Sequence, residues 1–238
     1  MYRKTSRKRH GTGITKNTPY KYKTILNNKH YLPTMKLIAQ GAEAKLYREN
    51  ATIIKERLAK AYRHPELDES LRQFRTRREA KVLQKLEDLQ FPAPHLREFS
   101  DKRMSIVMDF VPGETIKNVL QQKVQESRHL ATEIGQRIGQ LHQADIIHSD
   151  LTTSNMIKHG ETGKVNFVDF GLSFFSDKVE DQAVDLFLLD RALETTHLEL
   201  YPEIFEQVLE GYRQEFPDAE KVLSRLQLVE RRGRNKKG

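Results

Sequence analysis

The sequence HSDLTTSNMI occupies residues 148–157 and is the most informative segment of the chain. It lies between the apolar pairs Ile146–Ile147 and Met156–Ile157, which predicts a polar loop between two hydrophobic elements. An aspartate stands two residues after the histidine, and an asparagine stands five residues after that aspartate. An ordinary turn is the alternative interpretation, because Ser, Thr, Asn and Asp side chains bond nearby backbone groups and therefore favour turns.

A second motif downstream favours a chemical role for this loop. The triplet DFG begins at Asp169, fourteen residues after Asn155, at the end of an apolar strand. The short strands predicted at 156–158 and 165–170 form a hairpin that brings the two loops together. Asp150 is then a candidate catalytic base, while Asn155 and Asp169 are candidate oxygen ligands of Mg²⁺. An HxD motif followed by asparagine and then by DFG is the arrangement found in protein kinases.

Two charged residues upstream correspond to the phosphate-binding pair of a kinase. Lys55 follows two isoleucines on the predicted strand 52–57, so it is the candidate for the lysine that grips the α- and β-phosphates of ATP. Its acidic partner is expected on the predicted helix 64–89, where Glu79 fits better than Glu69 or Glu87. Glu79 borders the inward apolar side chains, which are Val82, Leu83 and Leu86. A surface lysine and a surface ion-paired glutamate are the alternative interpretations.

The turn between the first two predicted strands departs from the kinase pattern. Residues 35–47, MKLIAQGAEAKLY, read as a strand, a tight turn and a strand. The turn contains one glycine where kinases usually have GxGxxG. The backbone N–H groups of Gly41, Ala42, Glu43 and Ala44 are predicted to form a weaker phosphate cradle.

The pattern of apolar residues predicts an α+β, bilobal protein-kinase-like fold. Residues 35–110 are expected to form a small β-rich N-lobe, and residues 111–230 a reduced, helical C-lobe. Helices of the C-lobe are predicted at 129–144, 183–194, 202–216 and 218–232. In the N-lobe helix, Leu67, Leu71 and Phe74 are expected to form an apolar stripe that the later buried residues continue.

Charge is distributed unevenly along the chain. Residues 1–34 hold nine Lys or Arg and no acid, and residues 231–238 hold five and no acid. Subtracting both from the net charge of +8 leaves −6 for residues 35–230. The two segments are predicted to be a disordered basic arm and a basic tail that contact a polyanion, with nucleic acid as the first candidate. A solvated tail and, for the arm, an organelle transit peptide are the alternatives.

Composition excludes several classes of protein. Cysteine is absent, which excludes disulfides and cysteine-based metal sites or nucleophiles. The chain has no apolar run of about 18 residues and no apolar segment near its start, so neither a membrane span nor secretion is expected. These features predict a cytoplasmic protein, with the nucleus as the alternative compartment in a eukaryote.

Seven segments together give the chain a more specific resemblance. They are GAEAKLY, IIKERLAKAYRHPELD, LRQFRTRREA, HSDLTTSNMI, VDFGLS, EDQAVDLFLLDRALE and the RRGR tail. In this order they resemble the small atypical kinase subunit of the KEOPS complex, the p53-related protein kinase family. The resemblance covers roughly residues 37–235 and leaves the basic arm outside it.

The resemblance implies ATP and Mg²⁺ as cofactors and a role in making threonylcarbamoyladenosine on tRNAs that read codons beginning with A. It implies a sugar-kinase-like catalytic subunit and the other KEOPS subunits as partners. It further implies ATPase activity coupled to that catalytic subunit, together with serine/threonine protein kinase activity. By position, it assigns proton acceptance to Asp150, metal binding to Asn155 and Asp169, and phosphate positioning to Lys55 and Glu79.

The resemblance extends to the adenine site and to the support of the loop. Met108 and Phe110 are placed near the adenine-binding hinge. Asp185 is expected to bind the backbone of residues 148–150, as an aspartate at a similar place does in kinases. The family usually has glycine where this chain has Ser149, so the loop is expected to be slightly stiffer.

Two further features bear on the phosphoryl acceptor. No arginine precedes Asp150, so the common control of kinases through a phosphorylated loop is not expected. Only 11 residues separate Gly171 from Ala183, where a helix is predicted to begin. This length leaves no room for a long activation segment or a peptide-docking platform, which makes water a plausible acceptor.

Basic residues outside the predicted active site are candidates for nucleic-acid contact. Four arginines of the N-lobe helix and the C-terminal basic tail are expected to contact tRNA phosphates; the arginines are Arg72, Arg75, Arg77 and Arg78.

Two alternative functions are open to a chain with these motifs. One rival function is that of a small-molecule phosphotransferase of the aminoglycoside- or choline-kinase type, which the DFG triplet, the short C-lobe and GAEA argue against. The other rival is a non-catalytic scaffold, which the presence of all the key polar residues argues against.

Overall fold

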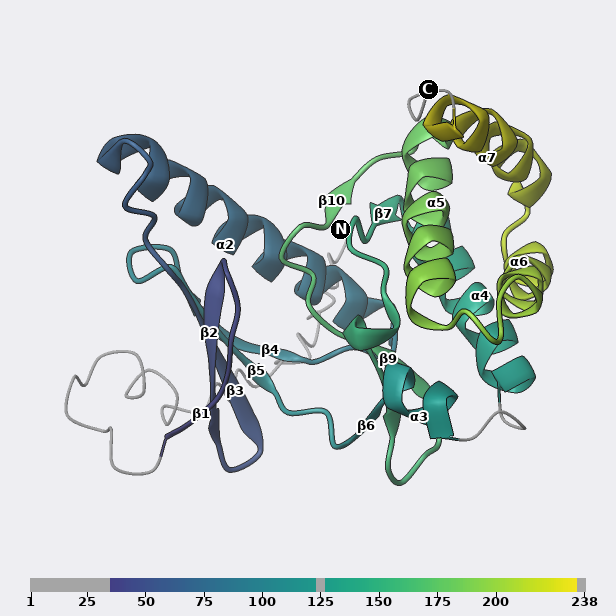
Figure 1. The fold of residues 1–238 in the computed structure, drawn as a ribbon. Coiled ribbons are helices and arrows are strands. Elements are labelled where there is room, and N and C mark those ends of the chain that lie inside the picture. The colour runs from purple at the N-terminus through teal and green to yellow at the C-terminus, as the bar shows by residue number, and fades with distance from the viewer. Residues whose placement is uncertain (1–34, 123–126, 235–238) are drawn as a thin grey trace, which may run out of the picture. The chain divides into compact units, whose positions relative to one another are not determined.

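The computed structural model describes residues 35–122 and 127–234, which form two lobes. The first lobe is a five-stranded antiparallel sheet, in the order β1-β2-β3-β5-β4, with one long helix (Figure 1). Its elements are β1 (Lys36–Gln40), β2 (Ala44–Glu49), β3 (Thr52–Arg57), α2 (Pro65–Asp88), β4 (Leu96–Ser100) and β5 (Ser105–Asp109). The predicted β-rich first lobe with a single long helix is therefore present.

Strand β3 lies at the centre of this sheet and fixes the position of Lys55. The strand reads TIIKER, and its isoleucines Ile53 and Ile54 are buried, as expected for β-branched residues on a covered sheet. Lys55 pairs with Leu46 on β2 and with Ile106 on β5. Because both neighbouring strands hold the backbone, the position of Lys55 is determined by the sheet rather than by a loop.

Helix α2 packs along the sheet beside β4 and β5 through its second half (Figure 1). Pro65 opens the helix, where proline costs no hydrogen bond, and Leu83 and Leu86 are buried. The stripe predicted for the first half is wrong in its burial: Leu67 and Phe74 are exposed. The inward side of that half carries the buried Asp68 instead, which pairs with Arg63 and Arg72 and does not join the apolar core.

The second lobe is mainly helical, with two small antiparallel sheets in the orders β6-β8-β9 and β10-β7. Its elements are β6 (Gly113–Thr115), α3 (Ile116–Gln122), α4 (Ser127–Gln143), β7 (Ile146–Ile147), the 3₁₀ turn η2 (Thr153–Asn155), β8 (Met156–His159), β9 (Val165–Phe167), β10 (Phe174–Phe175), α5 (Val179–Thr196), α6 (Glu203–Glu215) and α7 (Ala219–Arg234). The sequence predicted neither the short strands β4, β6, β7 and β10 nor α3, which depend on tertiary partners.

Helix α5 begins at Val179, four residues before the predicted start at Ala183. The N–H groups of Asp181 and Gln182 both bond the carbonyl of Lys178, which closes the first turn at that point. Asp181 also suits the positive end of the helix dipole. The connection that follows Gly171 is consequently even shorter than the sequence indicated.

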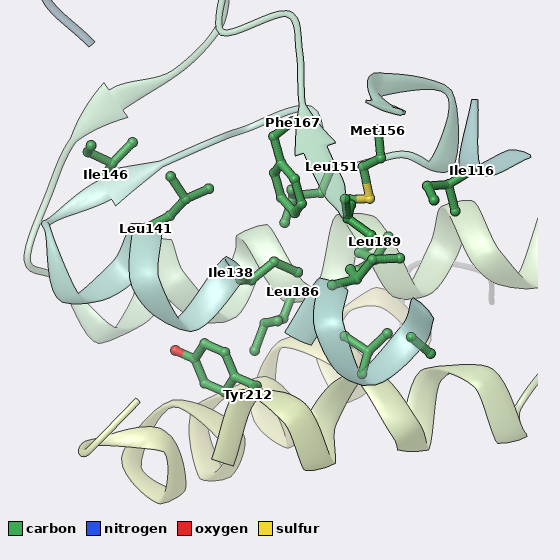
Figure 2. Close-up of a cluster of buried hydrophobic side chains, with 14 of the residues drawn as sticks. Ile116, Ile138, Leu141, Ile146, Leu151, Met156, Phe167, Leu186, Leu189 and Tyr212 are labelled. Atoms are coloured by element: carbon green, nitrogen blue, oxygen red, sulfur yellow. The ribbon is translucent and has the colours of Figure 1, made fainter. Parts of the chain in front are cut away.

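The second lobe is built around α4, which crosses α6 at close range. Gly135 of α4 and Gly211 of α6 lie at the crossing, where a Cβ atom on either would overlap the backbone of the facing helix. The core beside this crossing contains Leu141, Phe167 and Tyr212, all fully buried (Figure 2). Phe167 lies on β9, directly before the DFG segment, so core packing fixes the position from which that segment starts.

Two predictions concern the ends of the chain. The basic arm predicted at 1–34 lies outside the described residues. The basic tail predicted at 231–238 begins inside α7, which continues to Arg234, and residues 235–238 lie outside the described residues. None of the described helices is both long and apolar enough to cross a membrane.

Candidate active site

The loop at 148–155 is held in place by a single buried carboxylate on α5. Asp185 Oδ2 accepts the backbone N–H of His148 at 2.8 Å, and Oδ1 accepts that of Ser149 at 2.7 Å. His142 of α4 also contacts Oδ2, at 3.3 Å, and its other ring nitrogen meets the Tyr212 hydroxyl at 2.9 Å. The support expected from Asp185 is present, and the core of the second lobe extends it to α4 and α6.

Ser149 adopts a backbone conformation that favours glycine. Its φ angle is +66°, in the left-handed region that side chains with a Cβ disfavour. The two hydrogen bonds that the loop backbone donates to Asp185 hold it in this conformation. Further along the loop, the Thr153 hydroxyl contacts His197 Nε2 at 2.8 Å, and both side chains are buried. Helix α5 and the residue that follows it thus support the loop at two points.

Asp150 and Asn155 are brought together inside this loop. The Asn155 Nδ2 group donates to the Asp150 backbone carbonyl at 2.9 Å and to Asp150 Oδ2 at 2.8 Å. The Asn155 carbonyl accepts the N–H of Val168 at 2.9 Å, which joins the loop to the segment just before Asp169. These bonds fix the orientation of the Asp150 carboxylate and tie together the two loops that the sequence predicted to converge.

Lys55 connects the first lobe to the DFG segment. Its Nζ lies 2.7 Å from Glu79 Oε1 and 2.7 Å from Asp169 Oδ1, and Lys55 is only 5% exposed. Burial by itself would lower the pKa of Lys55, but the Glu79 and Asp169 carboxylates outweigh it and hold that pKa above its ordinary value. Lys55 is therefore protonated, and the expected pairing with Glu79 is present.

Arg57 is a member of this cluster that the sequence analysis missed. It lies two residues after Lys55 on β3, so both side chains point to the same face of the strand. Its guanidinium contacts Glu79 Oε2, the oxygen that Lys55 does not use. Glu79 therefore has a second buried cationic partner besides Lys55. The alternation of β3 was the available signal, because a charged residue at that spacing shares the environment of Lys55.

Asp169 and Asn155 fit the donor set expected for Mg²⁺. Asp169 exposes 46% of its side chain, and its Oδ1 accepts hydrogen bonds from Lys55 and from the N–H of Gly171. Its Oδ2 has no hydrogen bond within the described residues. Asn155 donates to Asp150 through Nδ2, so its amide oxygen Oδ1 is the atom that could bind a cation. No group of three or more His, Cys, Asp or Glu in residues 35–122 and 127–234 is arranged to hold a metal. A cation here would therefore take one carboxylate and one amide oxygen, with water and phosphate as its other ligands.

Electrostatics keep Asp169 ionised. Burial would raise the pKa of this carboxyl, but the ammonium of Lys55, its hydrogen bond and the N–H of Gly171 together lower the pKa below the usual range. Asp169 also has a φ angle of +63°, so its backbone is held in the left-handed region. A carboxylate that stays charged in a constrained backbone is suited to bind a cation.

The predicted phosphate cradle at 41–44 forms the turn between β1 and β2. The N–H of Gly41 bonds the carbonyl of Ala44 at 3.0 Å, so it is committed within the turn. The N–H groups of Ala42 and Glu43 make no hydrogen bond within the described part of the chain. The cradle that this turn offers is thus narrower than the four residues predicted.

The predicted adenine hinge follows the end of β5. Met108 is buried on β5, where it pairs with Ile53 of β3. The N–H of Phe110 bonds the carbonyl of Ala51 at 2.9 Å, and its ring lies 3.7 Å from the guanidinium carbon of Arg48. The backbone N–H of Phe110 is therefore used within the first lobe, although both residues border the junction of the lobes.

The four arginines of α2 make contacts within the chain. Arg72 pairs with Asp68 at 2.7 Å, and Arg75 pairs with Glu43 at 2.8 Å. The other two bond Asp101 Oδ2 and the Leu172 carbonyl; they are Arg77 and Arg78. Three of these charges therefore face carboxylates of the chain itself, while the Arg77 side chain stays 59% exposed. The tRNA contact predicted for the four arginines stays a prediction.

The imidazole ring of His148 is buried among aromatic side chains. Its ring is fully buried, lies 4.9 Å from the Phe170 ring, and makes no hydrogen bond of normal geometry within the described residues. Burial lowers the pKa of His148 below its ordinary value, although the nearby carboxylates, Asp185 first among them, partly oppose the shift. The imidazole is therefore neutral at neutral pH.

This buried histidine predicts a loss of stability in mild acid. The unfolded chain takes up a proton near pH 6.5 while folded His148 stays neutral, so stability should fall as pH drops from about 7 to 5, by at most about 1.4 kcal/mol per pH unit for one proton. Urea unfolding at several pH values measures this slope. The variant His148→Leu should have a shallower slope; an unchanged slope would show that other groups cause the pH dependence.

Comparison with known proteins agrees with this geometry. The protein kinase domain model matches residues 28–191 of the chain. The Rio2 kinase of Chaetomium thermophilum, solved as an ADP/Mg²⁺–phosphoaspartate complex, superimposes with a TM-score of 0.57 over 84% of this chain and 70% of that one. At 15% identity this likeness concerns the fold alone. The matching family model, the fold and the polar residues of the 148–155 loop and the DFG segment define a protein kinase.

Sequence similarity gives the family within that class. The KEOPS complex subunit Bud32 of Pyrococcus abyssi is 46% identical over 189 residues, which are 75% of this chain and 85% of that protein. A probable bifunctional tRNA threonylcarbamoyladenosine biosynthesis protein of Methanothermobacter thermautotrophicus is 43% identical over 202 residues, which are 83% of this chain and 36% of that protein. The chain belongs to the Bud32 family of protein kinases, which confirms the resemblance read from its motifs.

Proposed function

We propose that this chain is the ATP-consuming subunit of a KEOPS-type complex and supports the formation of threonylcarbamoyladenosine on tRNA. Two relatives support the assignment by name: one is a KEOPS complex subunit, and the other is a tRNA threonylcarbamoyladenosine biosynthesis protein. The proposed partners are the sugar-kinase-like catalytic subunit and the other subunits of such a complex. The proposed cofactors are ATP and Mg²⁺.

One observation carries the enzymatic part of the proposal. Lys55 is buried between the carboxylates of Glu79 and Asp169, at 2.7 Å from each. Such a cluster of buried charges costs desolvation energy and is a weak way to stabilise a fold. Perturbed and paired charges of this kind gather at sites that do chemistry. A scaffold without activity would have no use for this arrangement.

The chain's own residues have separate roles in the proposed reaction. ATP with Mg²⁺, when bound, supplies the phosphoryl group to be transferred and the charge that neutralises it. We assign Lys55 to the α- and β-phosphates, with Glu79 holding its ammonium in place. Asn155 and Asp169 would hold the cation. Asp150 would orient the acceptor and take its proton at the carboxylate that Asn155 fixes.

The acceptor is proposed to be water, with a protein hydroxyl as the less favoured candidate. The connection from Gly171 to Val179 contains only the two-residue strand β10, which pairs with β7. Peptide-phosphorylating kinases use a long segment here to position a substrate, and this connection is too short to do so. Positioning supplies most of the rate in phosphoryl transfer, so an unpositioned protein hydroxyl would react poorly.

Contact with tRNA is proposed for the basic segments at 1–34 and 231–238. These segments carry local charges of +9 and +5 with no acid. The arginines of α2 are the second candidate, although three of them pair with carboxylates of the chain itself. Electrostatic contact of this kind is expected to weaken steeply as salt rises.

The proposed function predicts slow ATP hydrolysis that a partner accelerates. The isolated chain should turn over ATP slowly, because its short connection between Gly171 and Val179 offers little that could cover bound phosphates. Adding the sugar-kinase-like subunit should raise the rate by about tenfold or more, since closing a site excludes water and completes its geometry. A coupled assay of ADP release with and without the partner measures the effect. No change in rate, or no complex by co-purification, would contradict the proposal.

A further inference from the structure

The phosphate turn at 41–44 is anchored through the side chain of Glu43. Arg75 Nη1 lies 2.8 Å from Glu43 Oε2. On the other oxygen, Arg63 Nη2 and Lys60 Nζ lie 3.7 Å and 3.9 Å from Oε1. Lys60 also donates to the carbonyl of Ala42. One carboxylate in the turn therefore faces three cations that belong to α2 and to the connection preceding it.

The backbone of the turn is also bonded to the connection between β3 and α2. The N–H of Leu58, just after β3, bonds the Glu43 carbonyl at 3.0 Å. Together with the Lys60 contact, this bond commits the carbonyls of Ala42 and Glu43 to the connection between β3 and α2. The N–H groups of these two residues stay without partners in the described residues, which leaves them for an anion.

The cations themselves are fixed to α2 by a buried acid. Asp68 is 3% exposed and accepts Arg72 Nε at 2.7 Å. Arg63 Nη1 lies 3.5 Å from Asp68 Oδ1, and the N–H of Lys60 lies 3.3 Å from the same oxygen. Arg63 thus bridges Asp68 and Glu43. The turn, the connection and the first half of α2 form one ionic network, which explains why that half of the helix buries polar residues.

Arg75 and Glu79 stand four residues apart on α2 and so share one face of the helix. Through Arg75 this face holds the phosphate turn, and through Glu79 it holds Lys55. A single rigid helix therefore sets the distance between the two groups that are expected to contact the phosphates of ATP.

We infer that Glu43 is a positioning residue, which holds the phosphate turn in place through its ion pair with Arg75. In ordinary kinases a glycine-rich loop covers the phosphates instead. The turn contains only Gly41, and alanines stand at positions 42 and 44, so its backbone has little conformational freedom. The ionic anchor fixes the turn before the nucleotide arrives. This inference rests on the ATP binding proposed above.

Two single substitutions separate positioning from direct electrostatics. Glu43→Gln removes a negative charge near the phosphates, whereas Arg75→Gln removes a positive one. Direct electrostatics would tighten ATP binding in the first variant and weaken it in the second. Loss of the anchor weakens binding in both, and we expect about 3–10-fold in each, because partly exposed ion pairs are individually modest.

Three further arms complete the experiment. The double variant should bind ATP no worse than Glu43→Gln alone, because that change already removes the carboxylate with which Arg75 pairs. Arg77→Gln is the matched control: it removes an ion pair of the same helix, to Asp101 at 2.7 Å, and should leave ATP affinity unchanged. Adenosine, which lacks phosphates, should bind all four variants and the wild-type chain equally.

Different results would contradict the role of Glu43 and the proposed binding of ATP. Binding is measured by displacement of a fluorescent ATP analogue with Mg²⁺ present. Tighter ATP binding by Glu43→Gln, affinities equal to that of Arg77→Gln, or a parallel loss for adenosine would each overturn the role of Glu43. A wild-type chain that binds no ATP would instead overturn the proposed function.

Discussion

Replacing Asp150 with asparagine should lower the rate of ATP hydrolysis by about 10²–10⁴-fold, the usual contribution of a positioned general base. Asparagine has the same shape, so it keeps the contact to Asn155, which donates to Asp150 Oδ2 at 2.8 Å. It loses the ability to accept a proton from water. ATP binding should change by less than about threefold, because the carboxylate is assigned to the acceptor and not to the nucleotide.

Single-turnover hydrolysis and equilibrium nucleotide binding, measured on the same preparation, test this expectation. Asp177→Asn is the matched control, since Asp177 is an exposed aspartate in the connection before α5 and should have wild-type turnover. Hydrolysis by Asp150→Asn within about fivefold of wild type would exclude Asp150 as the base. Equal loss of ATP binding and turnover would point to a disturbed fold.

Replacing Asp185 with alanine should lower the free energy of unfolding by about 3–5 kcal/mol. The carboxylate is buried and accepts the N–H groups of His148 and Ser149, and it contacts His142. Alanine leaves these donors without their acceptor, at about 1–3 kcal/mol for each buried donor. The loss is a large share of the 5–15 kcal/mol that holds a typical domain together. The loop would also lose the bonds that hold Ser149 in its left-handed conformation.

Urea unfolding followed by circular dichroism measures this loss, with Asp185→Asn as a milder variant that keeps one acceptor oxygen. Asp181→Ala is the matched control on the same helix: its carboxylate accepts one bond, from the Ser176 hydroxyl at 2.6 Å, and its removal should cost about 1 kcal/mol or less. A loss below about 1 kcal/mol for Asp185→Ala would show that the loop keeps its shape by other means.

Much of the candidate site could be predicted because its residues lie in short motifs. Asp150 and Asn155 are five residues apart, so one loop carries both, and the hairpin of β8 and β9 is close in sequence to both loops. The pairing of Lys55 with Glu79 followed from a strand and the next helix, 24 residues apart. Local periodicity is sufficient for such features, because neighbouring elements usually pack together.

Features that depend on competing partners were not predictable. The charged residues of α2 matched a nucleic-acid surface by type, yet Arg75 pairs with Glu43, 32 residues away. Leu67 and Phe74 fitted an apolar stripe, yet they are exposed, because the inward face of that half of α2 carries Asp68, which pairs with Arg63 and Arg72. Helical spacing gives the relative direction of side chains but not which face meets the core.

The sequence by itself determined the class of fold, the family and the residues that carry polar chemistry, because these are written in local motifs and in the periodicity of apolar residues. Tertiary structure alone decided which charges neutralise one another. Lys55 meets Asp169 across 114 residues, and Glu79 receives Arg57 as a second cation. Ion pairing depends on distances of a few ångströms between distant parts of the chain, and those distances exist only once the sheet, α2 and the DFG segment have packed together.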